Sequence, residues 1–597
     1  MVLQTLSKED RLYRMRHSAA HIMAEAVLEM FPDAQFAIGP PIEHGFYYDF
    51  LLARPLTPDD LPEIEQRMRA RMTSNVPFEH SEMSREDALA LFATQPFKVE
   101  LIQGIEDANV SLYKQGAFVD LCEGPHVERT GDVPPFKLTS VAGAYWRGDE
   151  KRPMLQRIYG ALFETQEELD DYLHRLEEAQ RRDHRKLGRE LELYTSSELI
   201  GSGLPSLLPK GATVRRLLEE YITGQEREAG YQHVYTPVLA KVDLYKRSGH
   251  WDHYRDSMYP PMALEHEELV LRPMNCPHHI LIYENALHSY RELPIRIAEM
   301  GTMYRYEKSG VVGGLSRVRA INLNDAHIFC TREQIGQEFA GVMRLVERAY
   351  ATLGITDYAY RLSLRDPADT EKFVQNDEMW DLGEKILRET LQELQLPFYE
   401  APGEAAFYGP KLDIQIRDVL GREESMSTIQ LDFHLPNQFD LTYIGEDGAQ
   451  HQPVILHRGV IGATERMMAY LIELYAGAFP TWLAPVQVAL IPIADRHADY
   501  AHNVGTRLKR AGFRIDIDDR SERMNAKIRR AQLQKIPYML VVGDREQEGE
   551  AVAVRTRAGE DLGSMPVFQF IDRLRDEVIT QLDPEVAGPD VGGESER

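Results

Sequence analysis

The amino-acid sequence predicts a multidomain α+β protein, and three observations support this prediction. The chain has 597 residues, which is too long for a single hydrophobic core, so we expect three or four domains. Residues 189–480 mix helix patterns with strand patterns in a way that favours a predominantly antiparallel sheet. After Trp482 the pattern becomes a regular succession of strand and helix, which is typical of a small α/β domain with a largely parallel sheet.

Composition narrows the class of protein. Hydrophobic residues make up 43% and charged residues 27%, as in an ordinary soluble globular protein. The net charge of −27 argues against non-specific coating of nucleic acid, although a local basic patch could still contact it. Three cysteines provide no disulfide framework and suit a reducing cytosol, so we expect a cytoplasmic protein. The N-terminus is charged, and no run approaches the roughly 20 apolar residues that span a bilayer, so we expect no signal peptide and no membrane contact.

Four side chains of the kinds that bind metals occur in the first part of the chain. A capping-box pattern predicts a helix over residues 7–30, which carries His17 and His21 four apart on one face. The motif D-L-C-E-G-P-H supplies Cys122 and His126, again four apart. The two pairs could form a four-ligand metal cage, a hydrolytic cluster of general bases and a thiol, or unrelated core positions. Strand-like runs lie between them at residues 45–50 and 110–113, so this domain is expected to be α+β.

A charged helix follows this domain. Thr165-Gln-Glu-Glu168 is a second capping box, and apolar side chains recur behind it at helical spacing. The predicted linker helix covers residues 166–188 and ends in a basic run before Gly188. That run is either a solvated linker or a contact for an RNA backbone.

A Gly-rich hairpin is predicted in the middle of the chain. Residues 302–306 and 320–329 are rich in β-branched and aromatic side chains, and residues 309–314 supply the connection. Asp325 and His327 share one face, because side chains two apart on a strand point the same way. The hairpin suits either a phosphate-binding, metal-assisted site or a solvated edge. Its other charged residues are Arg305, Glu307, Lys308, Arg317 and Arg319.

The other expected elements complete the two C-terminal regions. In residues 189–480, helices are expected near 212–230 and 332–353 and up to residue 475, with strands at 231–235, 411–417, 427–433 and 441–444. The α/β region is expected to contain strands at 486–493, 513–517 and 538–542 and helices at 495–511 and 523–535. Its positive face would include Arg523, Lys527, Arg529 and Arg530. Residues 583–597 are acidic and lack aromatic side chains, so we expect a disordered tail.

These residues together resemble the class II threonyl-tRNA synthetases, from about residue 7 to about residue 580. Arg305-Tyr-Glu307 with Arg317 resembles the second class-defining motif of the family. Gly462-Ala-Thr-Glu-Arg466 resembles the third motif. Helix 212–230 with Pro237 resembles the first, which forms the homodimer interface in the family. The resemblance implies an editing domain (1–165), a linker helix (166–188), a class II catalytic domain (189–480), an anticodon-binding domain (481–582) and the tail.

Several positions depart from the family pattern. A small N-terminal ubiquitin-like domain, common in the family, is expected to be missing, because the editing helix begins at once. Ser425-Met-Ser stands where many relatives have a Gln-Cys-Gly run, and Ala463 stands where many have Ser. Ser521 replaces an Asn that some relatives use at the anticodon. These departures concern the shape of the substrate pocket and the anticodon contacts, not the reaction.

The resemblance implies activation of L-threonine by ATP and its transfer to tRNA(Thr), giving AMP and pyrophosphate. A carboxylate must attack the α-phosphate, so fixed cations matter more than an acid or a base. By resemblance, Arg305 bridges the carboxylate and the α-phosphate, and Arg466 holds the γ-phosphate with support from Arg317. Glu307 contacts adenine, Lys411 completes the catalytic set, and Mg²⁺ accompanies ATP.

The resemblance also implies one zinc ion per subunit, bound by Cys276, His327 and His457. Three protein ligands leave the metal open to substrate, and threonine can offer its amino and hydroxyl groups. Asp325 would accept the hydrogen bond of that hydroxyl, so valine would be rejected. The other pocket positions that match the family are Tyr408, Lys411 and Gln430.

The two remaining sites follow the resemblance in the same way. Editing of Ser-tRNA(Thr) is assigned to His17, His21, Lys98, Asp120, Cys122 and His126, with polar groups orienting a water favoured over a zinc cage. Glu546 and Arg555 match the positions that read the anticodon. Two other classes are weighed: a catalytically idle relative that binds RNA and regulates, and a hydrolase whose main activity lies in residues 1–180. The intact arginines and metal ligands argue against both, and threonine-dependent ATP–pyrophosphate exchange separates all three.

Overall fold

The computed structural model describes residues 6–308 and 310–584. The chain forms two compact units, Met1–Glu177 and Glu178–Arg597. Within the described residues, no helix is both long enough and apolar enough to cross a membrane. The predicted disordered tail falls, from residue 585 onward, outside the described residues.

The first unit is built on helix α1 (Lys8–Met30) and two antiparallel sheets. The predicted cap is present, because the Ser7 hydroxyl accepts the Asp10 N–H at 3.1 Å. Ile22, Met23 and Val27 of α1 are buried in the domain core, and His21 on the same helix is buried as well. The larger sheet has the order β1-β3-β8-β7, with β2 paired to β3. Its strands are β1 Gln35–Phe36, β2 Pro41–Ile42, β3 Gly45–Leu51, β7 Phe136–Tyr145 and β8 Met154–Leu162.

The smaller sheet of this unit carries the second pair of candidate ligands. Its order is β4-β5-β6, with strands β4 Glu79–Ser84, β5 Asn109–Gln115 and β6 Phe118–Leu121. Cys122 directly follows β6, and its backbone N–H is still bonded to Ser111 O at 3.1 Å. The remaining helices of the unit are α2 Leu61–Ser74, α3 Arg85–Leu91 and α4 Pro96–Gln103.

The predicted linker helix is in fact two helices, α5 Gln166–Arg182 and α6 His184–Glu190. The capping box at the start of α5 is confirmed by reciprocal bonds between Thr165 and Glu168. The helix breaks at Asp183, because its carboxylate accepts the Arg185 N–H at 2.7 Å and so caps α6. Gly188 therefore lies inside α6 rather than after the end of the linker helix.

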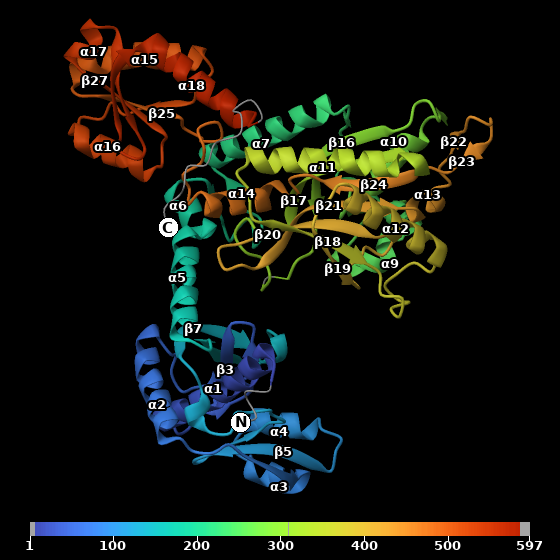
Figure 1. Ribbon diagram of the computed structural model, residues 1–597, viewed down its shortest axis with the longest axis vertical. Coiled ribbons are helices and arrows are strands. Elements are labelled where there is room, and N and C mark those ends of the chain that lie inside the picture. The colour runs from blue at the N-terminus through green and yellow to red at the C-terminus, as the bar shows by residue number, and fades with distance from the viewer. Residues whose placement is uncertain (1–5, 309, 585–597) are drawn as a thin grey trace. The chain divides into compact units, whose positions relative to one another are not determined.

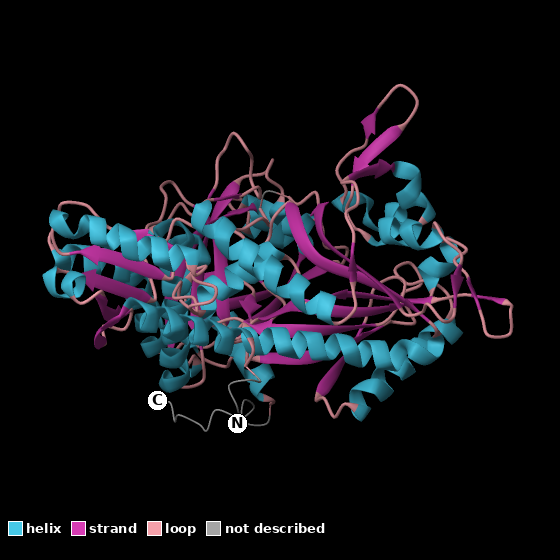
Figure 2. Ribbon diagram, turned by 90° about the horizontal axis from the view of Figure 1, so that it is seen from above, coloured by secondary structure: helices cyan, strands magenta, loops and turns pink. Residues whose placement is uncertain are grey.

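The second unit contains an eight-stranded sheet with the order β11-β16-β17-β24-β21-β20-β18-β19. The predicted antiparallel character is confirmed, since only the edge pairs β11–β16 and β18–β19 are parallel. Helices α7, α11, α12 and α14 share one apolar core with the sheet, and Figures 1 and 2 show long helices along the strands. The strands are β11 Gln232–His233, β16 Ile295–Tyr304, β17 Ala320–Cys330, β18 Tyr358–Leu364, β19 Phe398–Pro402, β20 Lys411–Arg417, β21 Glu423–Asp432 and β24 Val454–Gly459. The four helices are α7 Pro209–Glu228, α11 Ile335–Thr352, α12 Asp377–Glu393 and α14 Thr464–Leu474.

The predicted central hairpin is the pair β16–β17, and it is longer than expected on its first strand. Its register places Glu299 opposite Asp325 and Ile297 opposite His327. On the other side, β17 pairs with β24 so that His327 lies directly opposite His457. Two short predicted strands shrink, to β11 and to β22 at Tyr443–Ile444. The smaller elements are β9 Tyr194–Thr195, β10 Ser206–Leu207, β12 Leu239–Lys241, β13 Met262–Ala263, β14 Glu268–Leu271, β15 His288–Ser289, β23 Gln450–His451, α8 Val242–Arg247, α9 His250–Tyr254, α10 Cys276–Glu284 and α13 His434–Gln438.

The C-terminal part of this unit is a five-stranded α/β domain. Strands β26, β25 and β27 are parallel, as predicted, but β28 and β29 add an antiparallel hairpin that the sequence analysis missed. The strands are β25 Val488–Pro492, β26 Ile515–Ile517, β27 Tyr538–Val542, β28 Ala551–Thr556 and β29 Asp561–Pro566. The helices are α15 Ala498–Arg510, α16 Met524–Leu533, α17 Asp544–Glu548 and α18 Val567–Leu582.

Candidate functional sites

A cavity of about 430 Å³ lies over the eight-stranded sheet. The sheet positions its lining, because neighbouring strands direct alternate side chains to the same face. Lys411 on β20 is paired in register with Gln430 on β21, and His457 follows on β24. The predicted site residues that line this cavity are Cys276, Arg305, Asp325, Tyr408, Lys411, Gln430, His457 and Arg466.

Two arginines make this cavity suitable for an anion. Arg305 follows the last residue of β16, and Arg466 lies in the first turn of α14. Arg466 donates to the backbone carbonyls of Ser316 and Ser425 at 3.3 and 3.2 Å, which fixes its guanidinium. Burial, with a contribution from the nearby Arg466, lowers the pKa of Arg305. An arginine that is desolvated and repelled by a second arginine is stabilised by an anionic ligand such as phosphate.

The structure places Glu307 and Arg317 differently from the other predicted residues. Both lie on the connection between β16 and β17 and pair with each other at 2.9 Å. Neither is among the residues that line the cavity over the sheet. The Glu307 carbonyl also accepts two bonds from the Arg319 guanidinium, at 2.9 and 2.7 Å, so this loop carries its own polar network.

The floor of the cavity carries the predicted threonine-pocket residues. Lys411 Nζ donates to Asp413 at 2.6 Å, and the Tyr408 hydroxyl donates to Gln430. Asp325 is 7% exposed, and burial raises the pKa of its carboxyl. A buried carboxyl without a strong cationic partner is suited to bind a polar hydrogen of a ligand.

Cys276, His327 and His457 form a buried group whose donor atoms lie within 4.8 Å of one another. Three hydrogen bonds decide which ring nitrogens offer lone pairs. His457 Nε2 donates to Asp432 at 2.8 Å, which leaves Nδ1 unprotonated. His279 Nε2 donates to Glu299 at 3.1 Å, so His279 Nδ1 accepts from His327 Nδ1 at 2.8 Å.

The donor set fits zinc. Among the described residues, His327 Nε2 and His457 Nδ1 are buried without a hydrogen-bond partner, and these are the two nitrogens left with lone pairs. A cysteine and two imidazoles are an ordinary set of zinc ligands, and here Asp432 orients His457 while His279, itself bonded to Glu299, orients His327. The supporting residues Asp432, His279 and Glu299 were missed from the sequence, although His279 stands only three residues after Cys276.

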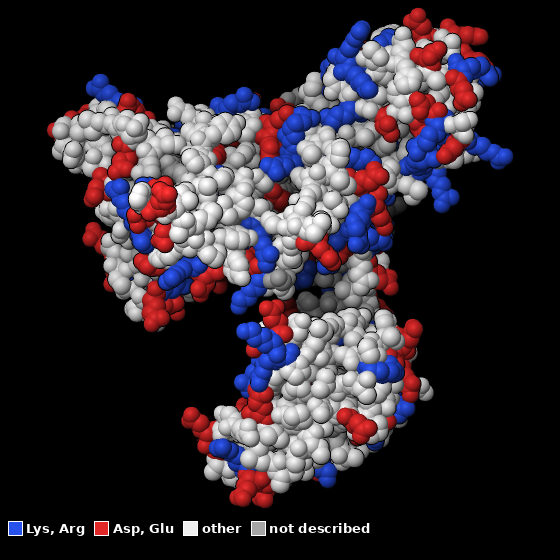
Figure 3. All heavy atoms as spheres, turned by 180° about the vertical axis from the view of Figure 1, so that it is seen from behind, with Lys and Arg blue, Asp and Glu red and all other residues white. Residues whose placement is uncertain are grey.

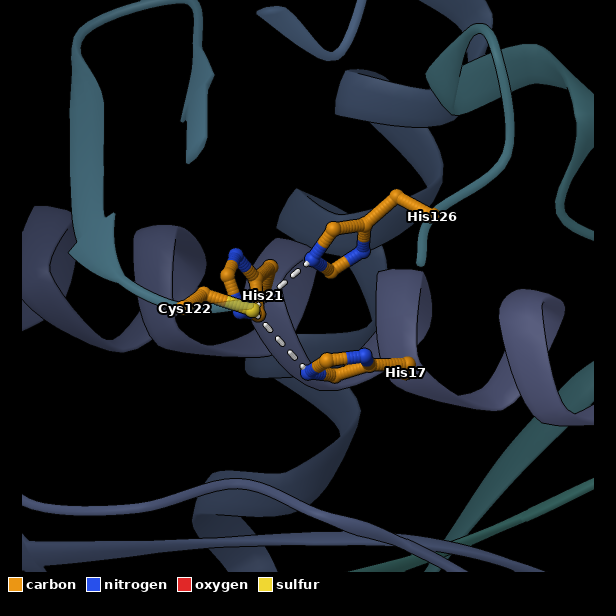
Figure 4. A group of neighbouring side chains, drawn as sticks. All are labelled: His17, His21, Cys122 and His126. Carbon is orange, nitrogen blue, oxygen red and sulfur yellow. Dashed lines mark hydrogen bonds between the residues drawn. The ribbon is translucent and has the colours of Figure 1, made fainter. Parts of the chain in front are cut away.

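The other predicted cluster lies in the first unit, where His17, His21, Cys122 and His126 also place their donor atoms within 4.8 Å of one another. Figure 4 shows Cys122 between two imidazoles, with its sulfur 3.3 Å from His17 Nε2 and 3.3 Å from His126 Nε2. Burial lowers the pKa of all three histidines and raises the pKa of the Cys122 thiol to about 12. At neutral pH the cluster therefore contains neutral imidazoles and a thiol.

A charged group adjoins this cluster, as the prediction for Lys98 and Asp120 requires. Lys98 Nζ lies 2.5 Å from Asp120, and His21 Nε2 lies 3.5 Å from the same carboxylate. Tyr48, which the sequence analysis missed, donates to Asp120 at 2.6 Å. The cluster opens into a cleft of about 860 Å³ whose lining includes His17, His21, Lys98, Asp120 and Cys122.

The predicted positive face of the C-terminal domain is only partly present. Lys527 is 3% exposed and donates to the Pro492 carbonyl, because it lies on the inner face of α16. Arg530 is paired with Asp518 and Glu522, which leaves Arg523 and Arg529 exposed. Figure 3 shows acidic and basic side chains interspersed over the face that it draws. Any nucleic-acid contact here is therefore local.

The two predicted anticodon residues lie on α17 and β28, which are consecutive in the chain. Glu546 is in α17 and accepts the Gly543 N–H at 3.0 Å. Arg555 is on β28 and lies 3.2 Å from Asp561. Helix α17 packs against β28, and Arg555 lies near the C-terminal end of that strand, in register with Met539.

Comparison with known proteins assigns the chain to a family. Residues 262–475 match the tRNA synthetase class II core domain (G, H, P, S and T), and residues 487–577 match an anticodon binding domain. Residues 110–159 match the threonyl and alanyl tRNA synthetase second additional domain. A threonine–tRNA ligase of Geobacillus kaustophilus is 55% identical over 97% of this chain and 89% of its own length. The chain belongs to the threonine–tRNA ligases.

Two further relatives agree with this assignment to the threonine–tRNA ligases. Threonine–tRNA ligase 1 of Bacillus subtilis is 53% identical over 95% of this chain and 89% of its own length. The RNA binding domain of a threonyl-tRNA synthetase from Cryptosporidium parvum superposes with a TM-score of 0.63 at 36% identity, covering 66% of this chain and 98% of that structure. The chain is thus a class II aminoacyl-tRNA synthetase with core, anticodon-binding and editing modules.

Proposed function

We propose residue roles for an enzyme that activates L-threonine with ATP and Mg²⁺, attaches it to tRNA and edits mischarged product. The observation that carries the proposal is that two arginines, a buried carboxyl and a metal-type triad meet at one cavity. Arg305 would hold the α-phosphate and the threonine carboxylate together, with Lys411 beside it. Arg466, already fixed by two carbonyls, would hold the γ-phosphate.

Glu307 and Arg317 are proposed to act from the loop above the cavity. Their mutual pair at 2.9 Å holds both side chains in one place. Glu307 would accept from the adenine amino group, and Arg317 would support the γ-phosphate when the loop closes on ATP. Threonine-dependent ATP–pyrophosphate exchange tests the whole assignment, because neither a regulatory RNA-binding relative nor a plain hydrolase catalyses it.

We propose that zinc bound by Cys276, His327 and His457 selects threonine. The metal, when bound, would ligate the amino and hydroxyl groups of threonine. Asp325, with Tyr408 and Gln430 beside it, would accept the hydroxyl proton in a hydrogen bond. A site that binds a hydroxyl rejects the analogue without it by roughly 10⁴–10⁵-fold, which excludes valine.

Zinc is expected at one equivalent per subunit. His327→Ala should remove it and lower threonine activation on the order of 10²-fold or more, since outer-shell partners alone account for about 10–100-fold. His451, an exposed histidine paired with Asp447, offers a matched control, and His451→Ala should keep both zinc and activity. Elemental analysis with exchange kinetics measures this. A zinc-free wild type, or full activation by His327→Ala, would contradict the proposal.

We propose that the C-terminal domain binds the anticodon loop of tRNA(Thr) through Glu546 and Arg555. The proposal is supported by the match of residues 487–577 to an anticodon binding domain, and the exposed Arg523 and Arg529 would supply the phosphate contacts. Trp482, Leu483 and Ala484 are buried in the core of the eight-stranded sheet, so the domain is best removed after residue 485.

Deletion of residues 486–597 is expected to leave ATP–pyrophosphate exchange within about threefold while tRNA charging is lost. Glu546→Ala with Arg555→Ala should raise the KM for tRNA about 10–100-fold, because one specific base contact is worth about 1–3 kcal/mol. Arg575→Ala, on an exposed i,i+3 pair of α18, is the control. Unchanged charging by the deletion variant would refute the anticodon assignment.

A homodimer and a cytoplasmic location are also proposed. Tyr235 is 94% exposed, and Val238 and Leu239 are each more than a third exposed. All three residues follow the C-terminal end of α7 in the sequence. Such an apolar surface suits a second copy of the chain, as in the family. The three cysteines are all free, which suits a reducing compartment.

A further inference from the structure

Ser18 lies between the two editing histidines in the sequence but faces away from the cleft. It is 0% exposed, and it does not belong to the residues that line the cleft. Its hydroxyl oxygen lies 3.0 Å from the Val127 N–H and 3.0 Å from His126 Nδ1.

The two partners of Ser18 fix the direction of the hydrogen bonds. The Val127 N–H can only donate, so the Ser18 oxygen accepts there. The hydroxyl has one proton, and His126 Nδ1 is the acceptor that the structure offers for it. The opposite tautomer would leave the hydroxyl proton without an acceptor at a fully buried position, which is unfavourable. His126 Nδ1 is therefore unprotonated, and the ring proton is on Nε2.

The proton on His126 Nε2 determines how His126 contacts Cys122. His126 Nε2 lies 3.3 Å from the Cys122 sulfur, so its N–H donates to that sulfur. The sulfur also lies 3.3 Å from His17 Nε2, which can accept the thiol proton. Cys122 and His17 line the cleft, whereas His126 does not belong to its lining. His126 thus acts from behind the cleft through the thiol.

We propose that Ser18 is a positioning residue, which holds His126 as the Nε2–H tautomer so that His126 orients the Cys122 thiol toward His17. This inference rests on the proposed editing function and deepens it. It also gives a physical reason for a water-orienting cluster rather than a metal cage, because an Nε2 that carries a proton has no lone pair for a cation.

Deacylation of Ser-tRNA(Thr) by the full-length enzyme under single-turnover conditions tests the proposal. Ser18→Ala should lower the maximal rate about tenfold, the order expected for one lost hydrogen bond, and leave the half-saturating enzyme concentration unchanged. In a His126→Ala background, Ser18→Ala should have no further effect, because a positioning role exists only through His126. ATP–pyrophosphate exchange of Ser18→Ala should match the wild type, because the activation site lies in the other compact unit.

Three results would overturn the inference. One is a Ser18→Ala rate equal to that of the wild type, and another is an undiminished Ser18→Ala effect in the His126→Ala background, which indicates a merely structural role. The third comes from the wild type itself: in ¹⁵N-histidine spectra, the signal that His126→Ala removes should have the Nε2–H signature, and an Nδ1–H signature contradicts the proposal. If the wild type does not deacylate Ser-tRNA(Thr), the proposed editing function itself is wrong, and this result differs from the failure of the Ser18 inference alone.

Discussion

Replacing Arg305 with alanine is expected to lower the rate of threonine-dependent ATP–pyrophosphate exchange by about 10²–10³-fold, the range found when one fixed donor to a developing negative charge is removed. The reaction joins two anions, and the half-buried Arg305, which directly follows β16, lines the same cavity as Cys276, His457 and Arg466. Burial already lowers its pKa, so the residue is held where only an anionic ligand compensates the lost solvation.

The measurement is the exchange rate as a function of ATP and threonine concentration. The loss should fall mainly on kcat, since the charge that Arg305 stabilises grows in the transition state. Arg422, whose side chain is 68% exposed and paired with Asp418 on the turn between β20 and β21, provides the matched control. If Arg305→Ala keeps its rate within tenfold, or if Arg422→Ala is equally impaired, the assignment of the phosphate site is wrong.

The group of Cys276, His327 and His457 shows how much of a site can be predicted from the sequence. Cys276, His327 and His457 are so far apart along the chain that their spacing alone predicts nothing, and only the resemblance joined them. The structure supplies the physical reason, because antiparallel pairing of β17 with β24 sets His327 opposite His457. Asp432 and Glu299 determine which histidine nitrogens keep a free lone pair, and no local pattern reveals those contacts.

Local signals predicted the elements that depend on local chemistry. The Ser7 cap, the Thr165–Glu168 capping box and the β16–β17 hairpin were all found from turn residues and periodicity. The linker break was missed because Asp183 reads equally well as a mid-helix charge, and only its bond to the Arg185 N–H makes it a cap. Neighbouring residues in the sequence are enough to predict that a helix forms here. Its break at Asp183 depends on one side-chain hydrogen bond.

The prediction of a positively charged face on α16 was only partly correct, for a different reason. Lys527 and Arg530 look exposed in a basic helix, yet burial depends on which helical face packs on the sheet. Lys527 faces β25 and satisfies its ammonium on the Pro492 carbonyl, and Arg530 turns to Asp518. The β28–β29 hairpin was missed because α17 separates it from the last predicted strand and β29 has little apolar pattern. The sequence thus shows which charged residues α16 contains, but not which of them face the solvent.

Loss of editing is the second large expected effect. Serine keeps the amino and hydroxyl groups that the zinc site would bind and lacks one methyl, which is worth only about 1–3 kcal/mol or roughly 10–200-fold. A hydrolytic site must therefore remove Ser-tRNA(Thr). Burial lowers the pKa of His17, so at neutral pH its imidazole is neutral and can act as the proton acceptor of the Cys122 thiol at the cleft.

His17→Ala and Cys122→Ala are each expected to slow the deacylation of Ser-tRNA(Thr) about 10²–10⁴-fold, the contribution of a positioned acid–base group. Charging with threonine should remain normal, so Ser-tRNA(Thr) accumulates when serine is supplied. His174→Ala, on the exposed side of α5, should edit like the wild type. The wild type should spare Thr-tRNA(Thr), because a cleft that accepts serine must exclude the extra methyl by size or by placement. Equal hydrolysis of the two aminoacyl-tRNAs, or unchanged rates in both cluster variants, would show that His17 and Cys122 do not form the proofreading site, whatever their geometry.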